Sequence, residues 1–427
     1  MGYFGEGQDV IFDGPVFPKK KGSTEEVLSR LDEVYNMDAD PLHGHVILYA
    51  TTLMDDNPVT EVCRRAYAKY MKKNMLVREI APGLQKLEQE VKRMAIEVLG
   101  LPDGTRANIT SGGSESLYCG INAAYQWAKD QRPEITEPEI VIPYSAHAAF
   151  SKWCHYTGIK IKRIPLGANY RADVQAMEAA ITPNTIMLAG SAPCWPYGLF
   201  DPIEDIAALA QKHGLWMHVD ACIGGYQAAF IEKLGVTFPV WRIGQVAGVS
   251  SMSADLHKHA YAAKPCSTIF FKNKDLQQYH WCHPADWPSG PYSTEALMGS
   301  FPASSVASAW AVMNYLGEEG YLELAQATLE ARTRYVEGIN SVDAMRCWDT
   351  DLSVLVFETG DLDTLAIMSG LFERQSFVFP IFQPMMIQLA VDPVPHKVID
   401  TFVTHLHEVA EGVRKGSITS QALLEHL

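Results

Sequence analysis

The sequence predicts an α/β protein in which a large, mostly parallel sheet carries helices on both faces and precedes a smaller α+β domain. The chain has 427 residues, enough for two domains. Between residues 140 and 272, short β-prone runs alternate with helical patterns, an alternation typical of parallel sheets. From about residue 303 the pattern turns helical, and the last segment mixes short strands with a closing helix.

The first elements precede the sheet. An irregular arm leads to a polar helix at 61–74, and residues 83–99 carry apolar side chains at helical spacing before Gly100, a favourable helix end. A helix and a loop fill the stretch up to residue 110. The β-prone runs then lie at 140–143, 159–165, 185–190, 215–220, 246–251 and 267–272.

The later elements form the smaller domain. Residues 353–359 and 385–391 read as strands, and a helix begins at about residue 395. We therefore divide the chain into three parts: an N-terminal arm and helix at 1–75, a large domain at 76–302 and a small C-terminal domain at 303–427.

Composition and charge narrow the class of protein. The formal net charge of −15 argues against nucleic acid or an anionic membrane surface as a general partner. Eight cysteines include no C-x-x-C pair, which favours a reducing compartment and speaks against a metal site. The first residues lack the order of a signal peptide, and no apolar run approaches the roughly 20 residues that span a bilayer. We expect a cytoplasmic protein without a membrane span.

A glycine turn at TSGGSES (110–116) leads into a helical pattern. Such a turn gathers backbone N–H groups at the positive end of a helix dipole, which suits a phosphate. Gly113 and Ser114 are therefore candidates to bind one, although the same pattern also describes a plain capped helix.

An aspartate ends the apolar run of HVDACIGG (218–225). Its charge would be costly there without a cationic partner, and a protonated ring nitrogen would be such a partner. The alternative is that Asp220 caps the following loop or helix.

A lysine between two histidines follows the run at 246–251, in SADLHKHAYAAKP. Lys258 could attack an aldehyde through its neutral amine, and we expect burial and neighbouring positive charge to lower its pKa. Ser253 and His257 could donate hydrogen bonds to a phosphate. The alternative is an ordinary loop lysine.

A histidine follows the first run of the alternating region, in PYSAHAAF (143–150). A lone histidine is more often structural. His147 nevertheless comes directly after a strand, where ligands bind in open α/β sheets, and its ring could stack on a flat heteroaromatic ligand.

These features together match one cofactor, pyridoxal 5′-phosphate (PLP). It offers an aldehyde to the lysine, a ring nitrogen to the aspartate, a phosphate to the glycine turn and a ring to the histidine. Bound to Lys258 as an imine (Schiff base), it would accept electrons from a substrate α-carbon. The predicted binding residues are Gly113, Ser114, His147, Asp220, Ser253, His257 and Lys258.

Five ordered motifs carry a family resemblance: TSGGSES, PYSAHAAF, GSAPCWPYG, HVDACIGG and SADLHKHAYAAKP. They are similar to those of the fold-type I PLP enzymes, among them the group II amino-acid decarboxylases and the sphingosine-1-phosphate lyase-like family. The resemblance implies an aspartate aminotransferase-like large domain with a mostly parallel seven-stranded sheet. It also implies that Lys258, Asp220 and His147 are the catalytic residues.

The resemblance further implies a homodimer with active sites at the subunit interface. In the family the partner subunit supplies phosphate donors, and LMGSFPAS (297–304) matches that segment, so Gly299 and Ser300 are candidates. Tyr49, Tyr261 and Lys264 match substrate-facing or gating positions of the lyases.

One segment departs from the family pattern. Where the lyases read N-x-L-H-P-D-V-F-P, this chain reads NMLVREIAP (74–82), so Val77 replaces a histidine that contacts the substrate phosphate. Arg78 could replace its charge or bind a substrate carboxylate. We therefore expect a small soluble amine substrate rather than a phosphosphingolipid.

The expected activity is that of a PLP-dependent lyase acting at the α-carbon, a decarboxylase first and an aldehyde-lyase second. A transaminase or a condensing enzyme would use the same cofactor. Two other classes stay open: a metal-dependent hydrolase that uses the H-x-D and H-x-H spacings, and a non-catalytic scaffold subunit.

Overall fold

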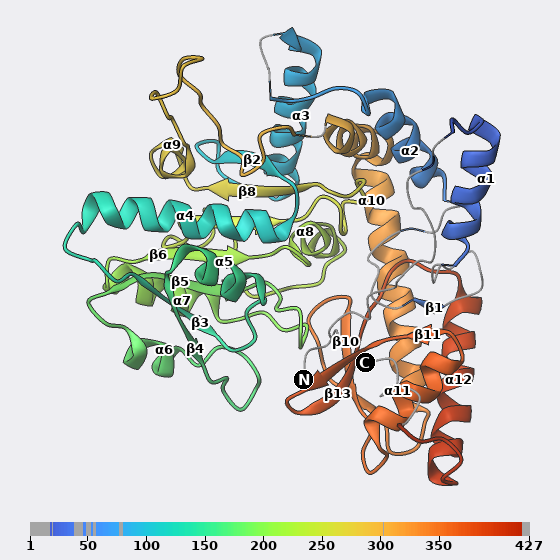
Figure 1. Ribbon diagram of the computed structural model, residues 1–427. Helices are drawn as coiled ribbons and strands as arrows, with labels where there is room; N and C mark the ends of the chain where they lie inside the picture. The colour runs from blue at the N-terminus through green and yellow to red at the C-terminus, as the bar shows by residue number, and fades with distance from the viewer. Residues whose placement is uncertain are drawn as a thin grey trace.

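The computed structural model describes residues 18, 20–37, 46–47, 53, 57–76, 80–301 and 303–420. A large domain is built on a seven-stranded sheet, and a small domain is built on a four-stranded sheet (Figure 1). In Figure 1 the small domain, in orange and red, lies below and to the right of the large sheet.

The large sheet has the strand order β2-β8-β7-β6-β5-β3-β4. Strand β8 is antiparallel to both of its neighbours, and the other pairs are parallel. Six strands therefore point the same way, and their carboxyl ends share one edge. The strands are β2 (Arg106–Thr110), β3 (Glu139–Pro143), β4 (Lys160–Ile164), β5 (Thr185–Ser191), β6 (Trp216–Asp220), β7 (Ser251–Ala254) and β8 (Ser267–Phe271).

Helices cover both faces of this sheet. One face packs against α4 and α5, and the other packs against α3, α7 and α8. In β6, for example, Trp216 faces the first layer while Met217 and Val219 face the second, as the alternation of a strand requires. The helices are α3 (Pro82–Val98), α4 (Gly113–Gln131), α5 (Ala149–Thr157), α6 (Val174–Ala180), α7 (Ile203–Lys212), α8 (Gly225–Lys233), α9 (Lys274–Gln277) and the 3₁₀ turn η3 (Gln278–His280).

The helix α10 (Ala303–Asn340) joins the two domains. It bends at Gly317, whose φ of 54° lies outside the helical region. The large-domain core takes in its residues up to Ala325, and the second core begins at Ala331. The division of the chain at residue 302 stays a prediction, but α10 itself contributes to both cores.

The small domain has the strand order β12-β13-β10-β9, all antiparallel. Its apolar face packs against α10, α11 and α12. Its elements are β9 (Arg346–Cys347), β10 (Val354–Glu358), α11 (Thr364–Glu373), β11 (Ser376–Phe377), β12 (Phe379–Phe382), β13 (Met385–Ala390) and α12 (His396–Arg414).

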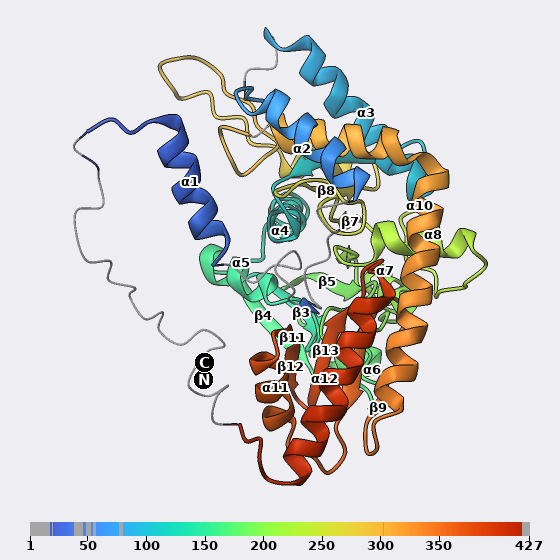
Figure 2. The ribbon, with the colours of Figure 1, turned by 90° about the vertical axis from the view of Figure 1, so that its right-hand side faces the viewer.

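The N-terminal elements reach both domains. Strand β1 (Val46–Ile47) pairs in parallel with β11, and α2 (Pro58–Tyr70) packs along α10. Helix α1 (Thr24–Tyr35) buries none of its residues and stands apart from the cores in Figure 2. In the part of the chain that the structure describes, no helix is long and apolar enough to cross a membrane.

Two predicted boundaries were wrong. Residues 106–110 form β2 rather than a loop, because Arg106 and Asn108 interrupt an apolar run that would have identified the strand. In the predicted strand at 246–251, residues 246–250 form a turn before β7, in which Val246 and Val249 pack in the core and Gly248 lies against helix α7. A Cβ on Gly248 would lie 2.6 Å from the backbone oxygen of Ala207.

Candidate active site

A cavity of about 360 Å³ lies at the carboxyl edge of the large sheet. Its walls come from the segments after β2, β3, β5, β6 and β7, where open α/β sheets bind their ligands. The lining residues are Ser111, Gly112, Gly113, Ser114, Glu115, Leu117, His147, Pro193, Trp195, Asp220, Cys222, Ile223, Asp255, His257 and Lys258. Among them are six predicted site residues: Gly113, Ser114, His147, Asp220, His257 and Lys258.

The glycine turn forms one end of the cavity. Helix α4 begins at Gly113, and no side chain caps its first turn, so its backbone N–H groups and dipole suit an anion. A Cβ on Gly113 would lie 2.9 Å from both the Asp255 carboxylate and the Cys222 sulfur. Only glycine therefore lets the helix start this close to the cavity wall.

Asp220 ends β6, which strands β8 and β7 separate from β2, the strand that leads into the glycine turn. It is 7% exposed, and its Oδ1 accepts a hydrogen bond of 3.1 Å from the backbone N–H of Cys222. The carboxylate is thus oriented by the loop that follows it and faces the cavity. It is suited to pair with a cationic ring nitrogen.

His147 lies in the loop between β3 and α5. Its Nδ1 accepts a hydrogen bond from the backbone N–H of Ala149 at 3.1 Å, which leaves the ring proton on Nε2. Burial lowers the pKa of His147, although the charge of Asp220 opposes this shift. A neutral, flat imidazole in the cavity wall can stack on a ring.

Arg163 of β4 fixes the His147 loop from behind. Its guanidinium donates to the carbonyl oxygens of Ala146 at 2.7 Å and of His147 at 3.3 Å, and also to the Ser151 hydroxyl at 3.1 Å. A fork of fixed donors holds three points of the loop together, which a lysine could not do in the same way.

Lys258 contacts a carboxylate that the sequence prediction did not include. Its Nζ lies 3.0 Å from Oδ2 of Asp255, which is 2% exposed. The other carboxylate oxygen accepts a hydrogen bond of 2.6 Å from the hydroxyl of Ser267 on β8. The lysine of the cavity is therefore half of a buried ion pair.

The predicted fall in the pKa of Lys258 was wrong for this reason. Burial lowers it, but Asp255, together with Cys222 and Asp220, outweighs burial and raises the pKa of Lys258 to about 12. Burial likewise opposes the charge of Asp255, yet Lys258 and His257 hold the pKa of that carboxyl below its usual value. In the absence of a ligand, Lys258 is an ammonium.

His257 presents one ring nitrogen to this pair. Its Nδ1 accepts the backbone N–H of Cys266 at 3.1 Å, so the proton of the neutral ring is on Nε2. That nitrogen lies 3.6 Å from Oδ2 of Asp255. Burial lowers the pKa of His257, with Asp255 opposing the shift. Nε2–H is placed to donate to an anion in the cavity.

Three predicted phosphate donors lie outside the cavity wall of their own chain. Ser253 is fully buried behind it, within 3.2 Å of the Cys222 sulfur and 3.3 Å of His218 Nε2. Ser300 contacts Asn74 at 3.0 Å, and Gly299 lines a second cavity. The placement of Ser253 gives its predicted role no support.

Two of the predicted substrate residues, Tyr261 and Lys264, are not in the wall either. Tyr261 is packed against Tyr321, at 6.5 Å between ring centroids, and burial raises its pKa. Burial and the charge of Lys258 lower the pKa of Lys264, while Asp392 raises it, so this lysine lies within electrostatic reach of Lys258. Tyr49 and Arg78 lie outside the described residues.

Sequence reasoning missed several lining residues. Asp255 stands three residues before Lys258, and this spacing was the available signal. Trp195 lies in the quoted motif GSAPCWPYG, and its place just after β5 was a weaker signal. Glu115 gave no signal, because its part depends on two backbone contacts, one of which is to the distant residue Leu297.

Glu115 joins the glycine turn to a distant loop. One carboxylate oxygen accepts the backbone N–H of Ser111 at 2.7 Å, and the other accepts that of Leu297 at 2.8 Å. The loop therefore lies against α4, one residue before Met298 and Gly299. This carboxylate is 3% exposed, so both contacts are sheltered from water.

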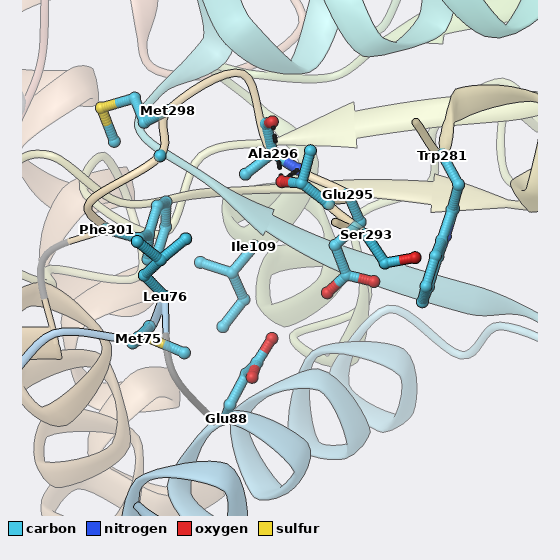
Figure 3. Close-up of a pocket in the computed structure, with 12 residues that line it drawn as sticks. Met75, Leu76, Glu88, Ile109, Trp281, Ser293, Glu295, Ala296, Met298 and Phe301 are labelled. Atoms are coloured by element: carbon cyan, nitrogen blue, oxygen red, sulfur yellow. Dashed lines mark hydrogen bonds between the residues drawn. The ribbon is translucent and has the colours of Figure 1, made fainter. Parts of the chain in front are cut away.

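The same loop borders the second cavity, of about 230 Å³ (Figure 3). In Figure 3, Glu88 points into it from helix α3, and Glu295 approaches from the loop. Lys92 lies 2.7 Å from Glu88 and 3.0 Å from Glu295, and all three side chains are buried. This cluster fastens the loop to α3.

The main cavity fits PLP by its donor set. A turn open to an anion, a buried carboxylate, a flat neutral imidazole and a lysine amine meet in one space. The close fit of Gly113 leaves the phosphate end free of side chains. Each group corresponds to one part of the cofactor.

The sequence profile of the pyridoxal-dependent decarboxylase conserved domain matches residues 54–346. The chain belongs to the pyridoxal-dependent decarboxylase family. Its cofactor is therefore PLP, as the donor set indicates.

Proteins of similar sequence support this family assignment. Sphingosine-1-phosphate lyase 1 of Rattus norvegicus is 38% identical over 348 residues, which cover 81% of this chain and 60% of that protein. A probable L-aspartate decarboxylase of Pyrococcus furiosus is 29% identical over 347 residues, covering 81% of this chain and 90% of that protein. The chain thus spans about 60% of the length of the lyase that it matches.

A solved structure confirms the predicted fold. The sphingosine-1-phosphate lyase of Burkholderia pseudomallei superposes with a TM-score of 0.86 at 25% identity, covering 96% of this chain and 95% of that one. The seven-stranded, mostly parallel sheet of this decarboxylase-family chain is the predicted aspartate aminotransferase-like domain.

The metal-hydrolase alternative receives no structural support. His218 bonds to Ser251 at 2.8 Å, and His259 bonds to the backbone oxygen of Ile223 at 2.8 Å, so the proposed ligands do not converge. The described ranges hold no cluster of three or more acidic, histidine or cysteine side chains arranged for a metal ion.

Proposed function

We propose that this chain is a PLP-dependent carbon–carbon lyase acting at the α-carbon of an amino compound, with Lys258 as the residue that binds the cofactor covalently. One observation carries the proposal: Lys258, Asp220 and His147 come from three different strand ends and line one cavity beside an uncapped helix start. Membership in the pyridoxal-dependent decarboxylase family supports it.

Each residue would have a separate part. Asp220 would accept a hydrogen bond from the ring nitrogen, and His147 would stack on the ring. Gly113, Ser114 and the Nε2–H of His257 would hold the phosphate. When bound, PLP supplies an electron sink for the pair released at the α-carbon. Lys258, once displaced by substrate, would donate a proton to that carbon from Nζ.

Loss of a carboxylate is the first candidate reaction, from a small soluble amino acid. The residue at position 77 supports it, since Val77 cannot contact a substrate phosphate as the histidine of the lyase pattern does. The relative of Pyrococcus furiosus, a probable L-aspartate decarboxylase, matches this chain over 90% of its own length.

Cleavage of a Cα–Cβ bond in a β-hydroxy amine is the second candidate. The sphingosine-1-phosphate lyase of Rattus norvegicus, at 38% identity, favours it. Such a reaction yields an aldehyde and needs a base on the hydroxyl, whereas decarboxylation yields carbon dioxide. The two products separate the candidates directly.

A homodimer would complete the site. Gly299 and Ser300 lie outside the cavity of their own chain, on the loop fastened by Lys92 and Glu115, and would reach the partner's phosphate. The exposed apolar side chains of α1 offer a surface for the second subunit; they are Val27, Leu28, Leu31, Val34 and Tyr35. The eight free cysteines support a cytoplasmic location.

The first test uses absorbance and mass mapping. The purified protein with PLP should show a yellow band that borohydride removes, and the label should map to Lys258. Incubation with a panel of amino acids and β-hydroxy amines, with carbon dioxide and aldehyde measured together, identifies the bond. A protein that takes up no cofactor would exclude the enzyme and leave the scaffold alternative.

A further inference from the structure

We propose that Asp255 is a positioning residue for Lys258, which holds the side-chain nitrogen of that lysine in one place whenever the lysine is not bonded to the cofactor. The inference rests on the proposed function, since it concerns the lysine that would bind PLP. It assigns a part to a carboxylate that lines the cavity but matches no portion of the cofactor.

The contact geometry fixes the carboxylate from two sides. Asp255 comes directly after β7 and is 2% exposed. Its Oδ2 lies 3.0 Å from Nζ of Lys258, while its Oδ1 accepts a hydrogen bond of 2.6 Å from Ser267. A charge-assisted contact of this length in a buried setting is directional as well as strong.

A chain of hydroxyls anchors Ser267 in turn. Its oxygen lies 2.8 Å from that of Ser116 on α4, which lies 2.6 Å from that of Thr110 on β2. All three side chains are buried. The carboxylate is therefore tied through Ser267 to two further elements of the large domain, and it cannot turn without breaking buried hydrogen bonds.

The glycine turn closes the remaining side. A Cβ on Gly113 would lie 2.9 Å from Oδ2 and 3.1 Å from Oδ1 of Asp255, so the helix start packs directly on the carboxylate. Both side chains line the cavity, but Asp255 is 2% exposed and bonded to Ser267, whereas Lys258 is 25% exposed. A ligand can thus draw Lys258 away while Asp255 stays in place.

Other ionisable groups surround the pair and must be counted in any pH measurement. They come from the lysine's own loop and from the segments after β3 and β6. These groups are His147, Asp220, Cys222, His257 and Lys264. Tyr226 of α8 and Cys266 also interact electrostatically with Asp255, and His259 does so with Lys258.

Bond formation between Lys258 and the cofactor gives the inference a measurable consequence. The ammonium must first lose its proton to solvent; the neutral amine then adds to the aldehyde carbon, a carbon–nitrogen double bond forms, and water leaves. A carboxylate that holds the ammonium makes this proton harder to lose. The pH dependence of cofactor capture therefore reports on the Asp255–Lys258 contact.

The test compares cofactor-free wild type with Asp255→Asn, following capture of PLP by stopped-flow absorbance from pH 7 to 10.5. Asparagine keeps the side-chain shape but removes the charge. We expect Asp255→Asn to capture PLP about tenfold faster than wild type, or more, at each pH below about 9, because a fall of one unit in the pKa of Lys258 multiplies the neutral fraction of the amine by ten. Asp205→Asn, which removes the charge of an exposed carboxylate on α7 that does not line the cavity, should leave the profile unchanged. Superimposable profiles for Asp255→Asn and wild type would overturn the inference.

A measurement on wild type alone decides the matter if Asp255→Asn does not fold. The capture rate is divided by the rate at which N-acetyl-lysine reacts with PLP at each pH. We expect the protein's rate to continue rising where the reference levels off; a protein rate that levels off first contradicts the inference. Borohydride mapping separates the two failures: label absent from Lys258 removes the proposed function, whereas label on Lys258 with an unchanged profile removes only the part of Asp255.

Discussion

Lys92 and Lys258 are both paired with buried carboxylates, and comparing them shows that such a pair does not by itself mark an active site. Lys92 is 9% exposed and lies between Glu88 and Glu295, which join α3 to the loop before Gly299. Lys258 is 25% exposed and faces one carboxylate, Asp255, which is itself anchored. The difference lies in the surroundings.

Position in the fold separates the two sites. Lys258 stands at the carboxyl edge of the sheet, beside a helix start without a side-chain cap, where an anionic ligand can bind. Lys92 lies within helix α3, where its ammonium is paired with the carboxylates of both Glu88 and Glu295. One lysine is held so that it can be released, and the other is held so that two segments stay together.

Removing Lys258, the lysine of the cavity, is the strongest test of its comparison with Lys92. Lys258→Ala should abolish covalent cofactor binding and lower turnover by about a thousandfold or more, because no other amine replaces the nucleophile. The absorbance band and product formation are the measurements, with circular dichroism to show that the chain folds. Lys86→Ala, an exposed change on α3, is the control. Substantial turnover by Lys258→Ala would exclude the assignment.

Removing Lys92 should lower the stability of the protein but leave the capture of PLP intact. Lys92→Met leaves two buried carboxylates without their cation, so the free energy of unfolding should fall by about 3–5 kcal/mol. Urea unfolding measures this, and the remaining folded protein should still capture PLP at Lys258. The matched control is Lys86→Met, since Lys86 lies 3.7 Å from Glu90 on the same helix but is 73% exposed. It should cost less than about 1 kcal/mol. Equal losses in the two variants would contradict the part given to Lys92.

The pH dependence of the free energy of unfolding tests the ion pair between Lys258 and Asp255 without the cofactor. The folded-state pKa of Lys258, about 12, lies above the ordinary value of 10.5. Its ionisation therefore stabilises the cofactor-free protein below about pH 10, and this stabilisation is lost as the pH rises towards 12. The amount is about 2 kcal/mol. Urea unfolding at rising pH should show this loss in wild type and not in Lys258→Met; parallel curves would argue against the ion pair.

A third cation, the half-buried Arg163, should give the smallest effect when it is changed. Arg163→Lys keeps the charge but loses the fork that holds the His147 loop. We expect PLP to bind about tenfold more weakly, equivalent to about 1–2 kcal/mol, with little change in unfolding. Fluorescence titration with PLP measures this, and Lys160→Met on the same strand, where Lys160 is 57% exposed, is the control. An unchanged affinity of Arg163→Lys for PLP would show that the His147 loop keeps its position without the guanidinium.

Much of the site could be predicted because strand ends are recognisable in sequence. Asp220 and His147 each follow an apolar run, and parallel strands bring such residues to one edge. The same logic placed Lys258 correctly even though its strand begins only at Ser251. The predicted strand began too early, but the residues that follow it still lie at the carboxyl edge of the sheet. The error in the bounds of β7 therefore did not change where Lys258 was expected.

Contacts across the chain could not be predicted. Ser253 has a hydroxyl that could donate to a phosphate, but it lies behind the cavity wall, against Cys222 and His218. Asp255 was overlooked, and with it the sign of the pKa shift of Lys258 was lost. Lys258 has histidines on both sides in the sequence and a carboxylate three residues earlier, and only the fold of this loop shows that the carboxylate is the group its nitrogen contacts.

The sequence by itself determined the alternation of strands and helices, the glycine turn, and the residue types that end the strands, and these sufficed for the fold class, the family and the cofactor. They are local properties, since backbone preference and apolar periodicity act over a few residues. Tertiary structure alone decided that Asp255 is the partner of Lys258, that Arg163 fixes the His147 loop, and that Glu115 joins Ser111 to Leu297. Buried electrostatics depend on distances of about 3 Å between atoms from distant segments, and only packing sets such distances.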